Sequence, residues 1–143
     1  MNQKTVLVVE DDATVSRCLG LILELGGYRV LHAQNGLEAL RFSQIHNDSI
    51  DLVLCDVLLP GESGASVAAS LRQFSPNNLV LFLSGYPFDI LVERRLLDRN
   101  ILQDGATFFL QKPFVAGDLL REIARILDTR SSRRTLRHAT AAY

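Results

Sequence analysis

The sequence predicts an α/β domain of the (β/α)5 type, with a doubly wound parallel sheet. Five short runs of apolar, often β-branched residues alternate along the chain with five segments that carry apolar residues at helical spacing. Strands that alternate with helices make right-handed crossovers, so the sheet is parallel and helices cover both of its faces. At 143 residues, with 48% hydrophobic and 22% charged side chains, the chain has the size and composition of about one globular domain.

The N-terminal part begins with an apolar run that ends at the acidic triplet Glu10-Asp11-Asp12. Asp12 is interpreted as the cap of the next helix rather than a metal ligand, because a carboxylate suits the free N–H groups at a helix N-terminus. Gly26-Gly27 ends that helix, and Asn35-Gly36 turns the chain into the second one. We expect, in order, a strand over 5–9, a helix to about 25, a strand over 28–33 and a helix over 37–46.

The C-terminal part continues the alternation. Ser63 is expected to start the third helix, and Pro76-Asn77-Asn78 breaks it. We expect a strand over 51–55, a helix over 64–74, a strand over 79–83, a helix around 90–97, a strand over 107–111 and a helix over 117–127. The domain thus covers 1–128, and 129–143, with four Arg and no acid, is expected to be a basic, flexible tail.

Charge and apolar content exclude several functional classes. The net charge of −1 carries no nucleic-acid signature, and no apolar stretch approaches the roughly 18 residues that a membrane span needs. Too few apolar residues precede Glu10 for a signal peptide. Cys18 and Cys55 have no metal-type spacing and are expected to be buried in the core, which favours a reducing, cytoplasmic location.

The most informative stretch is the strand over 51–55, which runs into a Pro-Gly-x-Ser-Gly loop with Asp56 at the junction. In an open parallel sheet, ligands bind just beyond the carboxyl ends of the strands. Other polar side chains are expected at the same edge: Glu10, Asp11, Ser84 and Lys112. The chain has two lysines against thirteen arginines, so a lysine at this position is notable.

These residue types suit phosphoryl transfer. Three crowded carboxylates, Glu10, Asp11 and Asp56, repel one another and call for a cation, and oxygen ligands with room for water suit Mg²⁺. A lysine and a hydroxyl can neutralise and bind the oxygens of a transferred phosphoryl group. A carboxylate that is free to attack phosphorus would then form an aspartyl phosphate.

On these motifs the chain resembles the receiver domain of two-component response regulators, over about residues 4–128. The matching pieces are Val8-Val9-Glu10-Asp11-Asp12, Asp51-x4-Asp56-x3-Pro60-Gly61-x-Ser63-Gly64, Leu83-Ser84-Gly85 and Lys112-Pro113-Phe114. The resemblance implies a flavodoxin-like fold with strand order 2-1-3-4-5. It also implies a signalling module that catalyses only its own phosphoryl transfer and dephosphorylation, rather than an enzyme.

The resemblance also implies residue roles. Asp56 would be the phosphoacceptor, Asp11 a direct Mg²⁺ ligand, and Glu10 a ligand through water. The backbone carbonyl of Leu58 would complete the protein ligands. Ser84 would be the switch hydroxyl, Lys112 the phosphate-pairing lysine and Phe109 the switch aromatic. Leu58 and Tyr86 would flank the approach of water.

The expected partner is a sensor histidine kinase or a phosphotransfer protein, and the resemblance allows a homodimer through the fourth helix, fifth strand and fifth helix. We expect no nucleic-acid contact and no membrane. The interval from Ser84 to Lys112 is several residues longer than in a typical receiver, and the excess falls in 93–104. In this respect the chain is similar to receivers attached to hybrid histidine kinases.

Two alternatives stay open at this point. One is a pseudo-receiver, a binding module that never takes phosphate, whose usual mark is a missing acid, lysine or hydroxyl; none is missing here. The other is an aspartyl-phosphate hydrolase of the haloacid dehalogenase type. That family has a second Asp two residues after the nucleophile, where this chain has Leu58.

Overall fold

The computed structural model describes residues 3–46 and 48–141, of which 131–141 as backbone alone. The chain divides into two compact units, Met1–Pro113 and Phe114–Tyr143.

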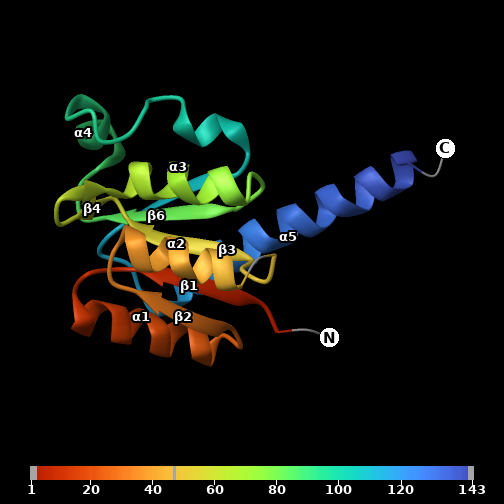
Figure 1. Cartoon of the computed structure of the whole chain (residues 1–143), viewed down its shortest axis with the longest axis horizontal. Coiled ribbons are helices and arrows are strands. Elements are labelled where there is room, and N and C mark those ends of the chain that lie inside the picture. The colour runs from red at the N-terminus through yellow and green to blue at the C-terminus, as the bar shows by residue number, and fades with distance from the viewer. Residues whose placement is uncertain (1–2, 47, 142–143) are drawn as a thin grey trace. The chain divides into compact units, whose positions relative to one another are not determined.

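A five-stranded parallel sheet forms the centre of the first unit (Figure 1). Its strands are β1 (Thr5–Val9), β2 (Arg29–Ala33), β3 (Leu52–Asp56), β6 (Val80–Ser84) and β7 (Thr107–Gln111). They lie in the order β2-β1-β3-β6-β7, and each neighbouring pair is parallel. Counted along the chain this is the order 2-1-3-4-5, so the predicted doubly wound, flavodoxin-like sheet is confirmed.

Helices connect these strands within the described part of the unit. They are α1 (Ala13–Leu25), α2 (Gly36–Ile45), α3 (Gly64–Phe74), α4 (Phe88–Glu93) and the 3₁₀ helix η1 (Ile101–Asp104). Asp12 caps α1, since its carboxylate accepts the N–H groups of Thr14 and Val15. Ser63 caps α3 in the same way. Both predicted caps are confirmed.

The main core lies between one face of the sheet and helices α2, α3 and α4 (Figure 1). Alternate strand residues point into it, among them Leu7, Val9, Val53, Val80 and Phe82. The helices contribute Ala39, Val67, Leu71 and Leu91. The strand residues in between, such as Val8, Leu54 and Leu81, are buried as well. The strands are therefore covered on both faces, as their continuous apolar runs predict.

The two cysteines differ in their surroundings. Cys55 is buried in β3, whereas Cys18 is exposed on α1, so the prediction that both are buried is wrong for Cys18. Helix α1 instead buries Ser16, Leu19, Gly20 and Leu23. The Ser16 hydroxyl lies 2.7 Å from Nδ1 of His32 in β2, and the ring of His32 lies against Gly20. These small residues let α1 approach the edge strand, which turns Cys18 outward.

Helix α4 ends at Glu93, and the predicted end at Leu97 is wrong. Arg95 adopts a left-handed backbone conformation, with φ of 59°. Its N–H and that of the next residue donate to the carbonyls of Val92 and Leu91, at 3.0 and 2.9 Å. These two bonds form a Schellman motif, which satisfies the last carbonyls of the helix and turns the chain. Glycine usually holds the left-handed position, so an arginine there gives no signal in the sequence.

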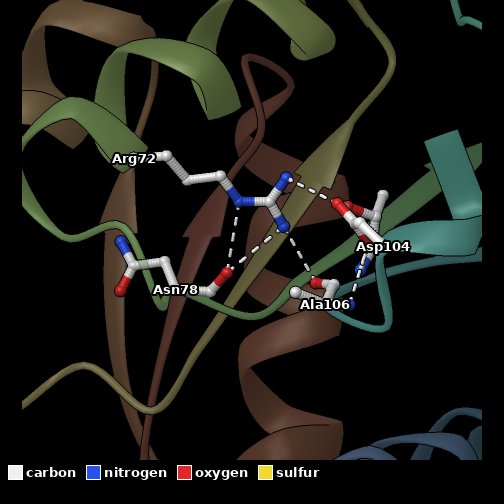
Figure 2. Close-up of polar contacts among 5 residues, drawn as sticks. Arg72, Asn78, Asp104 and Ala106 are labelled. Carbon is white, nitrogen blue, oxygen red and sulfur yellow. Dashed lines mark hydrogen bonds and ion pairs between the residues drawn. The ribbon is translucent and has the colours of Figure 1, made fainter.

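The long segment between β6 and β7 is fixed at its far end by Arg72 of α3 (Figure 2). The guanidinium donates to the Asn78 carbonyl at 3.2 and 3.3 Å and to the Ala106 carbonyl at 2.9 Å, and it lies 3.4 Å from the Asp104 carboxylate. That carboxylate accepts the N–H groups of Ala106 and Thr107 as well. Arg72 therefore ties the loops that precede β6 and β7 together, at the end of the sheet opposite the strands' carboxyl ends.

The second unit contains one long helix, α5 (Ala116–Ala141). The predicted helix end at Leu127 is wrong, because the backbone stays helical through 129–141. The mobility of 129–143 stays a prediction, and residues 142–143 lie outside the described residues. In the described residues, no helix combines the length and apolar character that a membrane span requires.

Candidate functional site

Four strands of the sheet present a polar side chain at their carboxyl ends. Asp56 and Ser84 are the last residues of β3 and β6, while Glu10 and Lys112 directly follow β1 and β7. The backbone stays connected across this edge, because the Lys112 N–H donates to the Ser84 carbonyl at 2.8 Å. Parallel strands end at a common edge, so these residues from distant parts of the sequence come together.

Asp56 lies at the centre of this group, and its side chain is 16% exposed. One carboxylate oxygen, Oδ1, accepts the N–H of Leu58 at 3.1 Å. The other, Oδ2, lies 3.6 Å from Nζ of Lys112. Both oxygens thus have a partner, and the predicted proximity of Lys112 to Asp56 is confirmed. The remaining exposure leaves the carboxylate open to a reactant from solvent.

Glu10 is the second carboxylate of the group and is only 5% exposed. Burial raises its pKa from 4.5 to about 7, and a hydrogen bond with the Asp56 side chain and the negative charge of that residue act in the same direction. The N–H of Asp12 and the charge of Lys112 oppose this change. Near neutral pH Glu10 is therefore partly protonated, and it lies in contact with the Asp56 carboxylate.

The loop after Asp56 folds back on the Asp56 backbone. It forms a short hairpin of two strands, β4 (Leu58–Leu59) and β5 (Glu62–Ser63). The N–H of Gly64 then donates to the Val57 carbonyl at 2.7 Å. A Cβ atom on Gly64 would lie 2.2 Å from the carbonyl oxygen of Asp56, so only glycine permits this closure. The Gly64 of the sequence motif is therefore a steric requirement of the site.

Ser84 is 2% exposed, and its Oγ accepts the N–H of Tyr86 at 3.0 Å. A hydroxyl that accepts one bond keeps its own hydrogen for donation to another group. Tyr86 itself is 43% exposed, and the guanidinium of Arg94 lies 5.4 Å from the centre of its ring. Leu58, the other residue expected to flank the approach of water, is 40% exposed. The side chains of Leu58 and Tyr86 are therefore both at the protein surface beside the site.

Phe109, the expected switch aromatic, is half-buried on β7. Its ring meets that of Phe88 edge to face, with the ring centres 5.5 Å apart. Phe88 is the first residue of α4. The aromatic pair therefore joins β7 to α4, and the switch role of Phe109 stays a prediction.

Two of the three carboxylates expected to bind Mg²⁺, Glu10 and Asp56, lie in contact at this edge. Asp11 is exposed, and among the described residues no three or more His, Cys, Asp and Glu side chains lie close enough to hold a metal ion. Mg²⁺, however, usually binds one or two carboxylates and keeps several waters. Glu10 and Asp56 supply two carboxylates in contact, whose mutual repulsion a divalent cation relieves. Within the described residues the predicted crowding of Glu10, Asp11 and Asp56 is therefore not observed, and the ligand roles of Asp11 and of the Leu58 carbonyl stay predictions.

Two features of this edge have no signal in the sequence. Glu62 of the hairpin bonds to the first residue of α2, Gly36, a contact that only the three-dimensional path of the loop reveals. A cavity of about 340 Å³ opens beside Glu10, and its lining includes Arg17, His32 and Glu38.

Known proteins share this fold and sequence pattern. The pattern of the response regulator receiver domain matches residues 6–124. The response regulator receiver protein CpdR of Brucella abortus is 30% identical over 124 residues, which cover 87% of this chain and 97% of CpdR. A cyclic di-GMP phosphodiesterase of Thermotoga maritima is 34% identical over 117 residues, 82% of this chain and 29% of that protein.

A solved structure agrees with these similarities. The receiver domain from the hybrid histidine kinase CckA superimposes with a TM-score of 0.69 and 28% identity, covering 86% of this chain and 98% of that domain. Most of the curated relatives are longer proteins, of which the chain spans between 12% and 50%.

Proposed function

The chain belongs to the response regulator receiver family of two-component systems, and we propose that it accepts a phosphoryl group on Asp56. The observation that carries this proposal is the position of the Asp56 carboxylate at the end of β3. One of its oxygens lies 3.6 Å from the ammonium of Lys112, and its side chain is hydrogen-bonded to Glu10. A nucleophile, a fixed positive charge and a second carboxylate are the parts that phosphoryl transfer to a carboxylate needs.

The reaction begins with attack of an Asp56 oxygen on the phosphorus of a donor. The bond between phosphorus and the leaving atom of the donor breaks as the new P–O bond forms, and the leaving group departs with the electron pair of the broken bond. Lys112 neutralises negative charge on the transferred group, and the Ser84 hydroxyl donates its hydrogen to one of the phosphoryl oxygens. The product is an aspartyl phosphate.

Magnesium belongs to this proposal as a cofactor. Glu10, Asp11, Asp56 and the Leu58 carbonyl are the groups that would hold it. When bound, Mg²⁺ neutralises charge that develops on the phosphoryl oxygens. The chain's own residues contribute the rest: Glu10 and Asp56 in contact, and Lys112 on the other side of Asp56.

The phosphodonor in this proposal is a sensor histidine kinase or a phosphotransfer protein in the cytoplasm. The similarity to CpdR and to the receiver domain of a hybrid histidine kinase supports this class of partner. The signal would leave through the surface of α4 and β7. A shift of the Ser84 loop toward a phosphoryl group would reach α4 directly along the chain. The Phe88–Phe109 ring contact supports this route, because it joins α4 to β7.

The test is incubation of the protein with acetyl phosphate and Mg²⁺, followed by intact mass measurement. We expect the wild type to gain one phosphoryl group and Asp56→Asn to gain none. A pseudo-receiver would gain none in either form. A hydrolase would instead consume the donor through many turnovers without accumulating the phosphorylated protein. Either of those results would overturn the proposal.

A further inference from the structure

Glu62 places a carboxylate at the start of a helix that is remote in sequence. It is the first residue of β5, in the hairpin after Asp56, and it is half-buried. Its Oε2 accepts the N–H of Gly36 at 3.0 Å, and Gly36 is the first residue of α2. The bond satisfies one of the free N–H groups of the helix, and the carboxylate charge lies near the positive end of the helix dipole.

The fit between these two residues is close. A Cβ atom on Gly36 would lie 2.3 Å from Oε1 of Glu62 and 3.0 Å from a methyl carbon of Val67. A side chain at residue 36 would therefore displace the carboxylate. Glycine at the start of α2 therefore leaves the room that the Glu62 carboxylate occupies.

The hairpin links the Glu62–Gly36 hydrogen bond to the proposed phosphoacceptor, Asp56. In β4 and β5, Leu59 is paired with Glu62 and Leu58 with Ser63. Leu58 is also the residue whose N–H donates to Oδ1 of Asp56 at 3.1 Å. One strand of the hairpin therefore holds Asp56, and the other strand is anchored on α2 by Glu62. If the anchor moves, the Leu58 N–H moves with it.

We propose that Glu62 is a positioning residue for phosphoryl transfer to Asp56. Its bond to Gly36 holds the hairpin so that the Leu58 backbone stays against the Asp56 carboxylate. This inference rests on the proposed phosphorylation of Asp56. Loss of the bond leaves the sheet and the charged groups in place but lets the Leu58 backbone move away from Asp56. Small displacements of groups at a reacting centre lower rates strongly, so we expect phosphorylation to slow by about tenfold.

Three variants and one control test the contact. Glu62→Ala removes the carboxylate, and Gly36→Ala displaces it with an added methyl group. Glu62→Gln keeps an oxygen that accepts the Gly36 N–H. The control is Glu38→Ala, because Glu38 is another carboxylate at the start of α2 and accepts the N–H of Gln34 at 2.9 Å. It supports the same end of the helix without touching the hairpin.

The first readout is the rate of phosphorylation by acetyl phosphate in saturating Mg²⁺. We expect about tenfold slower reaction for Glu62→Ala and Gly36→Ala, recovery to within about threefold of wild type for Glu62→Gln, and no change for Glu38→Ala. The double variant of Gly36→Ala with Glu62→Ala should react no slower than either single one, because both remove the same contact. Equal slowing by Glu38→Ala would overturn the inference, since helix stability alone would then explain the effect.

The second readout does not depend on activity. In metal-free, ¹⁵N-labelled protein, the amide resonance of Leu58 should shift in Glu62→Ala and Gly36→Ala and stay near its wild-type position in Glu38→Ala. An unchanged Leu58 resonance in Glu62→Ala overturns the inference even if Asp56 is phosphorylated. If the wild type takes no phosphoryl group, the proposed function fails and the Leu58 resonance alone decides whether Glu62 positions the hairpin.

Discussion

Nζ of Lys112 lies 3.6 Å from Oδ2 of Asp56, and the two residues lie at the carboxyl ends of two different strands of the sheet, β7 and β3. The opposite oxygen of Asp56 accepts the Leu58 N–H, so the carboxylate is held from both sides. The Lys112–Asp56 pair is partly exposed, so its contribution to folding stability is small. Lys112 matters instead for the reaction, because it places a positive charge where phosphoryl oxygens would arrive.

Replacing this lysine should therefore affect chemistry more than stability. We expect Lys112→Met to slow phosphorylation of Asp56 by at least about tenfold, because charge on the transferred group is no longer neutralised. The melting temperature should change little. Acetyl phosphate kinetics followed by intact mass measure the rate.

The chain offers a matched control in its only other lysine. Nζ of Lys4 lies 3.9 Å from Oδ1 of Asp51, away from the carboxyl ends of the strands. Lys4→Met should leave the phosphorylation rate at the wild-type value. If Lys112→Met reacts as fast as Lys4→Met, the proximity of Lys112 to Asp56 has no role in the reaction.

The stability of the metal-free protein should depend on pH through Glu10. Its pKa is about 7 in the folded chain and 4.5 ordinarily, so the folded state binds more protons than the unfolded state between these values. Stability contributed by protonated Glu10 is fully present below pH 4.5 and is lost as pH rises toward 7. The loss is at most about 3 kcal/mol. Urea unfolding in chelator at about pH 5 and about pH 8 measures it.

Glu10→Gln should flatten this part of the pH dependence, since the amide does not titrate. Glu24→Gln, at an exposed position of α1, should leave the slope of the wild type unchanged. If Glu10→Gln and the wild type lose the same stability between the two pH values, other groups account for the slope.

The Arg72 contacts should matter for stability rather than for phosphorylation. Arg72→Met leaves the carbonyls of Asn78 and Ala106 without their guanidinium partner and removes the positive charge beside Asp104. We expect a loss of about 2–3 kcal/mol in the free energy of unfolding, measured in urea. Arg41→Met, at an exposed position of α2, should cost less than about 0.5 kcal/mol. A phosphorylation rate for Arg72→Met far below that of Arg41→Met would contradict the separation of this network from the site.

The aspartyl phosphate should decay slowly. Hydrolysis needs a water in line with the bond to phosphorus, and a polar side chain nearby can orient that water. Leu58 cannot form a side-chain hydrogen bond, and the ring of Tyr86 is bulky and lies under Arg94. Removal of the donor followed by timed mass measurement gives the decay rate. We expect the double variant of Leu58→Asn with Tyr86→Glu to decay faster; if it does not, a water held by the Tyr86 hydroxyl becomes the better explanation.

Much of the site could be predicted because its residues directly follow apolar strands. Asp56, Glu10 and Lys112 come at the points where β-type runs stop, and parallel strands bring such points to one edge. Two helix ends could not be predicted. The end of α4 depends on Arg95 in a left-handed conformation, and α5 continues through a segment without a clear apolar period. The local sequence does not show where either helix ends.

The contact between Glu62 and Gly36 could not be predicted for a different reason. The two residues are 26 positions apart, and their contact depends on how far the hairpin after Asp56 leans toward α2. Asn35-Gly36 resembles an ordinary turn, and Glu62 resembles an ordinary loop residue. Their relation follows only from the packing of two loops at the same edge of the sheet.

The central claim, that Asp56 is the phosphoacceptor, is tested most directly by finding where a phosphoryl group goes. Protein treated with acetyl phosphate and Mg²⁺ is reduced with borohydride, which converts an aspartyl phosphate to homoserine, and the peptides are then sequenced by mass spectrometry. We predict homoserine at residue 56 in the Mg²⁺-treated sample and unmodified Asp56 when chelator replaces the metal. Homoserine at another residue, or none at residue 56 despite Mg²⁺, would contradict this account.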